Sequence, residues 1–124
     1  MTLQELTQKL GLQSAASSIS LDREVTGGYA SDLLSDVIAN SQKSNVWVTL
    51  QTHVNIVAVA SLKELAGIVI VNGRKPESKA IEKARQEDVP ILLTNLEAFE
   101  IVGRLYQIGI GGNRNRGSGT AATR

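Results

Sequence analysis

The sequence predicts a three-layer α/β fold, in which a largely parallel sheet is flanked by helices on both faces. The first observation is that a strand pattern followed by a helix pattern occurs three times between residues 46 and 106. This alternation requires right-handed crossovers and therefore parallel strands. The second observation is that the runs GIVIV and PILLT are almost wholly aliphatic, as is typical of strands that are buried on both faces.

The N-terminal part of the sequence predicts a helix, then a segment that is either an edge strand or a loop, and then a short strand. Residues 2–5, TLQE, form a capping box, and the helix that they begin has leucines at helical spacing and ends at Gly11. Residues 13–20 are small and polar, which leaves a weak edge strand or a loop open. Residues 23–26 predict a short strand that ends on a pair of glycines, and a helical pattern starts at Ser31.

The three strand–helix units follow. The expected strands are 46–50, 67–71 and 89–93, and the expected helices are 55–65, one from Pro76 to 87, and one that ends at Tyr106. Pro76 suits the first turn of a helix. The run Thr94–Glu97, TNLE, predicts a second capping box. Residues 1–110 therefore predict one domain. The chain from Gly109 on is rich in glycine and poor in large apolar residues, so residues 111–124 are expected to be a disordered tail.

Composition excludes several classes of function. The chain has 124 residues, a formal net charge of +1 and 3% aromatic residues, which argues against a nucleic-acid groove. It has no cysteine, so thiolate metal sites and thiol catalysis are excluded. No phosphate-binding P-loop motif, signal peptide or membrane-spanning run is present, and a cytoplasmic location is expected. We expect no catalytic residues, no metal and no bound cofactor.

Polar residues follow each of the three strands and should meet at the carboxyl edge of the sheet, where open α/β sheets bind ligands. They are rich in hydrogen-bond donors and carry one cation, which suits an anionic or nucleotide-like ligand. The candidates are Gln51, Thr52, His53, Asn55, Asn72, Gly73, Arg74, Thr94 and Asn95. A second reading stays open for several of them, in which the threonines and Asn95 only cap helices and Asn72-Gly73 is only a turn.

The titratable residues give weaker signals. His53 is the only histidine, and we interpret it as a hydrogen-bonding loop residue rather than a catalytic base. Asp32 and Asp36 stand four residues apart and are interpreted as a solvated helix face. Asp22 and Arg23 either pair with each other or bind turn backbone.

The order Asp22, Arg23, Thr26, Gly27, Gly28 resembles the DRTGG domain, and the blocks VWVTLQTHVNIVAVA, GIVIVNGRKP and VPILLTNLEAFEIVGRL are similar to that family in the same order. The resemblance covers residues 1–110. It implies a fold similar to the N-terminal domain of HPr kinase/phosphorylase. It also implies a regulatory role at a dimer interface that helps to hold adenine nucleotides, as in some inorganic pyrophosphatases, and, for small stand-alone members, an accessory role near iron-only hydrogenases.

These observations predict a non-catalytic regulatory or accessory module that acts as a homodimer and senses an adenine nucleotide or a similar phosphorylated ligand. The turn at 26–29, with Gly27, Gly28 and Tyr29, is expected to pack on a sheet edge or a second subunit and to contact any nucleotide. Asp22, Arg23 and Thr26 of the same motif are expected to contribute to this site. Two alternatives stay open: a phosphotransfer component, or a purely structural protein that binds a host enzyme. Neither nucleic acid nor membrane is an expected partner.

Overall fold

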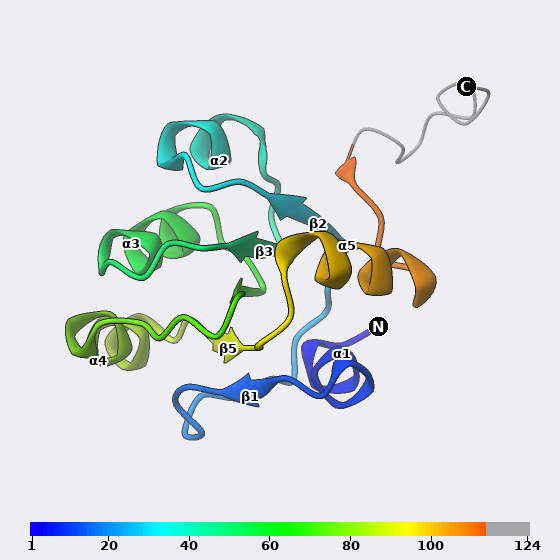
Figure 1. Ribbon diagram of the computed structural model, residues 1–124. Helices are drawn as coiled ribbons and strands as arrows, with labels where there is room; N and C mark the ends of the chain where they lie inside the picture. The colour runs from blue at the N-terminus through cyan, green and yellow to red at the C-terminus, as the bar shows by residue number, and fades with distance from the viewer. Residues whose placement is uncertain (114–124) are drawn as a thin grey trace.

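A five-stranded sheet organises the part of the chain that the computed structural model describes, residues 1–113 (Figure 1). The strand order is β1-β5-β4-β3-β2; β2 to β5 are parallel, and β1 runs antiparallel to β5. The α/β fold with a largely parallel sheet is therefore confirmed. The elements are α1 (Leu3–Leu10), β1 (Gln13–Ser14), β2 (Gly27–Ala30), α2 (Leu34–Asn40), β3 (Asn45–Thr49), α3 (Asn55–Leu62), β4 (Gly67–Ile70), α4 (Ser78–Glu87), β5 (Ile91–Leu93) and α5 (Ala98–Gln107).

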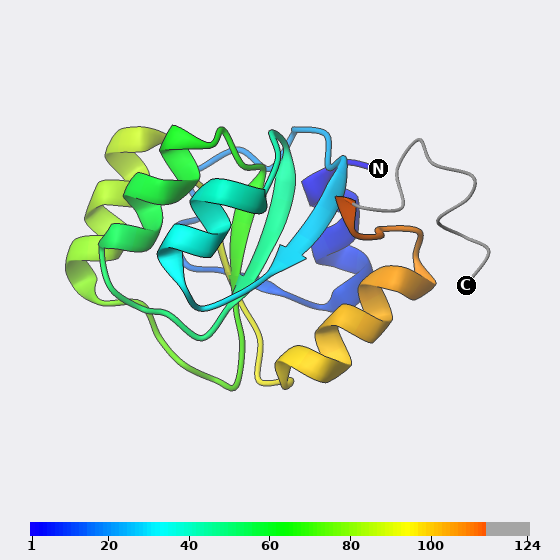
Figure 2. The same ribbon diagram turned by 90° about the horizontal axis from the view of Figure 1, so that it is seen from above.

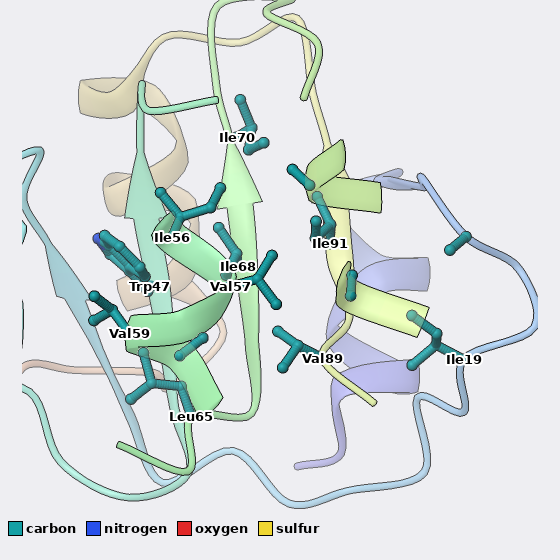
Figure 3. Packing of buried hydrophobic residues seen from close by; sticks show 14 of the residues in the cluster. Ile19, Trp47, Ile56, Val57, Val59, Leu65, Ile68, Ile70, Val89 and Ile91 are labelled. Atoms are coloured by element: carbon teal, nitrogen blue, oxygen red, sulfur yellow. The ribbon is translucent and has the colours of Figure 1, made fainter. Parts of the chain in front are cut away.

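Two helical layers cover the sheet. Helices α2, α3 and α4 lie on one face, and α1 and α5 lie on the other (Figures 1 and 2). Each layer has its own apolar core, and β3 and β4 are buried along their whole length because both of their faces are covered. Figure 3 shows the first core, in which Trp47 of β3 packs near Ile56 of α3. The Trp47 Nε1 donates a 2.8 Å hydrogen bond to the Ser31 carbonyl, which satisfies its buried polar atom.

The N-terminal elements are partly as predicted. The capping box of α1 is present, and Gly11 ends the helix with a φ of 65°. Both readings of residues 13–20 hold in part, because a two-residue strand is followed by turns. The strand predicted at 23–26 is wrong. These residues run beside the N-terminal residues of the chain, where Leu3 N donates to Arg23 O at 2.8 Å. The glycine pair itself forms the start of β2.

Two predicted helix starts also differ. Helix α4 begins at Ser78, so Pro76 lies in the preceding loop rather than in the first turn. The second capping box is absent, because α5 begins only after Glu97 and has no side-chain cap. Thr94 instead accepts a 3.1 Å hydrogen bond from Leu96 N, which closes a local turn.

The chain after α5 returns to the sheet along the outer edge of β2. Ile110 is buried in the core beneath α5, and Gly28 N donates a 2.9 Å hydrogen bond to Gly111 O. Residues 109–113 thus have a defined place, although their composition predicted disorder from Gly109 on. The prediction for the rest of the tail, residues 114–124, lies outside the described residues.

Candidate functional site

The carboxyl edge of the sheet, where we expect a ligand, has a particular topology. Helix α4 leaves β4 toward one face of the sheet, whereas α5 leaves the neighbouring β5 toward the other face (Figure 1). Such a reversal between adjacent strands is the usual place of a ligand crevice in open α/β sheets. The loops that follow the two strands meet there: Asn72 N donates to Leu96 O and Gly73 N donates to Thr94 O, both at 2.9 Å.

Two hollows remain on either side of these joined loops. One has a volume of about 630 Å³ and includes Asn72, Asn95 and Phe99 in its lining. The other has a volume of about 370 Å³ and includes Arg74 and Asn95. Four of the predicted candidates, Asn72, Gly73, Arg74 and Asn95, therefore lie together at this edge, and Thr94 lines the second hollow with them.

The polar groups of the loop after β3 form hydrogen bonds within the protein. Asp32 Oδ1 accepts hydrogen bonds from Thr49 Oγ1 at 2.9 Å and from Leu50 N at 2.7 Å. Gln51 Nε2 donates to the Asp32 carbonyl at 2.8 Å, and Thr52 O accepts from Glu77 N at 3.0 Å. Asp32 lies before α2, so its interpretation as part of a solvated helix face is wrong.

His53 is exposed and is a hydrogen-bonding loop residue, as predicted. Its Nδ1 accepts a 3.1 Å hydrogen bond from Asn55 N at the start of α3, so the proton of the neutral ring is on Nε2. No carboxylate contacts His53 through the hydrogen bonds and ion pairs found within residues 1–113. This geometry lacks the partner that a catalytic histidine needs.

The first residues of the DRTGG-like motif lie at the opposite, amino edge of the sheet. Arg23 donates to the Asp88 carbonyl at 3.1 Å and to its carboxylate at 3.2 Å, so its partner is Asp88 rather than Asp22. Thr26 Oγ1 donates to Lys43 O at 2.9 Å. Asp22 is exposed, and its backbone N–H donates to Ser20 Oγ. Asp22, Arg23 and Thr26 are therefore separated from the carboxyl-edge candidates by the length of the sheet.

The glycine pair is part of β2 rather than a turn. Gly27 is buried opposite Asn45, and Gly28 lies opposite Val46. A Cβ on Gly28 would meet Val46 at 3.6 Å and Ile110 at 3.7 Å, which is ordinary contact, and its φ is not positive. Ile110 and Gly111 lie against the strand here, and a side chain at position 28 would fit beside them.

A groove of about 970 Å³ follows this outer edge of β2. Its walls come from α2, α5 and the segment after α5, and its lining includes Tyr29, Asn40, Val102, Tyr106 and Asn113. The part of the lining that the structure describes contains apolar groups, amides and tyrosines but no charged side chain. Such a surface suits a protein segment or an uncharged ligand better than a phosphate.

Tyr29, which lines this groove, forms a polar contact with Asp36. The Tyr29 hydroxyl donates to the Asp36 carboxylate at 2.8 and 2.9 Å, and Asn40 Nδ2 donates to it at 2.8 Å. Burial of Tyr29, followed by this hydrogen bond, raises the pKa of its hydroxyl. Hydrogen bonds from Ser31, Tyr29 and Asn40 lower the pKa of the Asp36 carboxyl below its usual value. Asp36 therefore fixes the side chains of Tyr29 and Asn40, and its interpretation as a solvated helix residue is wrong.

Two further absences concern only the described residues. Within residues 1–113 there is no cluster of three or more histidine or acidic side chains that could hold a metal ion. In the same range no helix is both long and apolar enough to cross a membrane.

The comparisons with known proteins bear on the fold. The structure is similar to the crystal structure of the CBS and DRTGG domains of the regulatory region of Clostridium perfringens pyrophosphatase, complexed with its activator diadenosine tetraphosphate. The chain shares its fold with a DRTGG-containing regulatory region. The TM-score is 0.62 at 12% sequence identity, and the match covers 84% of this chain and 45% of the pyrophosphatase chain. No protein-family model and no curated protein matches the sequence.

The sequence alone missed several contributors to these sites. Phe99 and Lys75 line the carboxyl-edge hollows, Asp32 holds the loop after β3, and Asn113 reaches the groove along β2. Asn113 lies in the segment whose composition predicted disorder, and it donates a 2.7 Å hydrogen bond to the buried Asn45. Only Phe99 carried a usable signal, because this large aromatic residue stands between Glu97 and Glu100 at the start of α5.

Proposed function

We propose that this chain is a non-catalytic regulatory or accessory module that senses an adenine nucleotide or a similar phosphorylated ligand. The observation that carries the non-catalytic part is that its candidate catalytic groups are held in structural contacts. Arg23 pairs with Asp88, Asp36 accepts from Tyr29, and His53 accepts from a backbone N–H. The fold likeness to a regulatory region bound to a nucleotide activator supports the ligand class by analogy.

The module acts as a homodimer in this proposal, with the outer edge of β2 at the subunit boundary. Large apolar side chains are exposed on or beside the two helices that wall the groove: Leu33 before α2 and Ile38 on α2 are 64% and 40% exposed, and Tyr106 on α5 is 53% exposed. The segment after α5 pairs with β2 at Gly28, and the exposed apolar side chains beside this edge favour association. A second copy of the chain would cover them.

Thermal unfolding with ATP, ADP, AMP and diadenosine tetraphosphate tests the ligand class, and multi-angle light scattering tests the dimer. A nucleotide at 100 times its dissociation constant should add about 2.7 kcal/mol to the free energy of unfolding. Lack of stabilisation by all four nucleotides would contradict the sensing function. A monomer mass at micromolar concentration would contradict the dimer.

A phosphotransfer component is the second candidate. His53 is exposed and its Nδ1 is occupied by Asn55 N, so a phosphoryl group would reach its Nε2. Incubation with labelled ATP distinguishes the two functions. Stable incorporation that is lost in His53→Ala would favour phosphotransfer over sensing.

A purely structural partner is the third candidate, and the exposed Leu62 and Phe99 are the apolar contacts that it would use. The resemblance to the DRTGG family implies a host enzyme such as an iron-only hydrogenase. Co-purification with a host enzyme, without stabilisation by any nucleotide, would favour this function.

A further inference from the structure

The two hollows at the carboxyl ends of β4 and β5 differ in chemistry and share one wall. The loops 72–75 and 94–97 that separate them lie side by side below the sheet in Figure 2, held by the two backbone hydrogen bonds already described. Asn95 lines both hollows. Its Oδ1 lies so close to Gly73 that a Cβ there would approach it to 3.0 Å. A ligand that lies across this wall would touch both hollows at once.

The larger hollow has the chemistry of a site for a planar, hydrogen-bonding ring. Phe99 borders it and is 90% exposed, while Ile101 and Leu105 on the same helix are buried. Single exposed apolar residues are common, but this ring stands at the rim of a hollow whose other groups include the amides of Asn72 and Asn95. An aromatic face beside amide donors and acceptors is the arrangement that proteins use to stack and read nucleobases.

The smaller hollow has the chemistry of an anion site. Arg74 and Lys75 both line it, and both are exposed. Neither side chain forms an ion pair with any residue in the range 1–113. Thr94 and Gln13 add neutral polar groups to the lining, and no carboxylate is among the described lining residues. Two cations that form no ion pair within residues 1–113, beside these neutral polar groups, favour a phosphate group.

We infer that the carboxyl edge of β4 and β5 is a two-part nucleotide site, with the base against Phe99 and the phosphates at Arg74 and Lys75. This inference rests on the proposed sensing function and gives that function a location. Glu97 lies in the hollow with Phe99, where its carboxylate repels phosphate and accepts hydrogen bonds from ribose hydroxyls or an exocyclic amine. The charges thus orient the ligand in one direction. The groove along β2, which has no charged described lining residue, is left to protein contacts.

Three probes separate the two halves of the site: ATP, adenosine and tripolyphosphate. Affinities are measured by titration calorimetry on the full chain. Phe99→Ala should weaken ATP and adenosine by about tenfold and leave tripolyphosphate unchanged, because base stacking is worth roughly one order of magnitude or more. The double variant Arg74→Gln, Lys75→Gln should weaken ATP and tripolyphosphate and leave adenosine unchanged.

Matched controls keep the test specific. Leu62→Ala removes another exposed apolar side chain, at the end of α3. The double variant Lys79→Gln, Arg85→Gln removes the same two charges from the exposed surface of α4. Both control proteins should bind all three probes like the parent chain. An equal loss in the controls would overturn the assignment.

The outcomes also distinguish this site from the sensing function itself. Unchanged ATP binding in both Phe99→Ala and the Arg74/Lys75 variant would overturn the site but leave the sensing function standing. Binding of tripolyphosphate without any preference for ATP would overturn the two-part site as well. Failure of every nucleotide to bind the parent chain would overturn the sensing function together with the site.

Discussion

The glycines at positions 28 and 73 differ in whether the backbone conformation requires them. Gly28 has no positive φ, and a Cβ there would make ordinary contacts of 3.6 Å or more. Gly73 has a φ of 67°, and its Cβ would approach Asn95 Oδ1 to 3.0 Å. The conformation of the backbone thus requires glycine at 73 but not at 28.

We predict that Gly73→Ala lowers the free energy of unfolding by about 1–2 kcal/mol, which is the usual cost of a left-handed residue with a Cβ. Gly28→Ala should leave stability unchanged or raise it by up to about 1 kcal/mol, because alanine has less freedom in the unfolded chain. Urea unfolding followed by the fluorescence of Trp47, the only tryptophan, measures both. A larger loss at Gly28 than at Gly73 would contradict this assignment.

The Tyr29–Asp36 contact predicts a pH-dependent stability. Hydrogen bonds hold the pKa of Asp36 below its usual value, so it stabilises the fold above the pKa of the unfolded chain, near 4. That contribution is lost as the pH falls through the lower pKa of the folded state. Tyr29→Phe removes the hydroxyl proton that the two Asp36 oxygens share, so the pKa of Asp36 should rise toward its usual value.

The difference in unfolding free energy between the parent chain and Tyr29→Phe should therefore be largest near neutral pH and should shrink at acidic pH. A carbon-detected NMR titration of the Asp36 carboxyl gives its pKa directly. Tyr106→Phe is the matched control, since its hydroxyl accepts from Gly112 N and, among residues 1–113, forms no hydrogen bond with a carboxylate. The control should show no such pH dependence; a parallel trend would assign the effect to another acid.

At the scale of an element, α1 owes its start to a reciprocal cap. Glu5 N donates to Thr2 Oγ1 at 3.2 Å, and Thr2 N donates to Glu5 Oε1 at 2.9 Å. Leu3 and Leu6 on this helix are fully buried against the sheet. Fraying of the first turn would therefore expose the apolar core that α1 and α5 cover.

Thr2→Ala should therefore destabilise the protein by about 1 kcal/mol, the typical value of an N-cap side chain. Thr2→Ser keeps the acceptor and should retain most of the stability. Thermal unfolding measured by circular dichroism compares the two. Equal melting temperatures for the alanine and serine variants would show that the backbone contacts near residue 2 hold the helix without the cap.

At the scale of the whole molecule, the described C-terminal residues complete the edge of the sheet. Ile110 is 7% exposed in the second core, Gly111 O pairs with Gly28, and Asn113 donates to the buried Asn45. These contacts join the last helix to β2 and β3. The segment therefore belongs to the folded unit in spite of its glycine content.

A chain that ends at Asn113 should be more stable than one that ends at Gly109 by about 2 kcal/mol, since burial of one isoleucine is worth roughly that amount. Denaturant unfolding of the two truncated chains measures the difference. Because both lack residues 114–124, the comparison isolates residues 110–113. Equal stability would show that this segment contributes nothing to the fold.

The fold class, the three strands between residues 45 and 93 and the cap of α1 could be predicted from the amino-acid sequence. Aliphatic runs such as 67–70 and the repeated alternation of strand and helix depend on local periodicity, which a single sequence displays. The gathering of Asn72, Arg74 and Asn95 at one edge was also predictable, because parallel strands place their carboxyl ends together.

The positions of the DRTGG-like residues in the fold depend on tertiary contacts that the sequence does not display. Arg23 and Asp88 are 65 positions apart in the sequence, and their pairing depends on how two loops meet at the amino edge. Ile110 and Gly111 pack beside β2 because β2 is the edge strand of the sheet. No local sequence pattern predicts which strand lies at an edge. The predicted start of α5 was wrong for a related reason. The Thr94 side chain closes a turn that is hydrogen-bonded to the loop after β4, so tertiary packing overrode the capping signal.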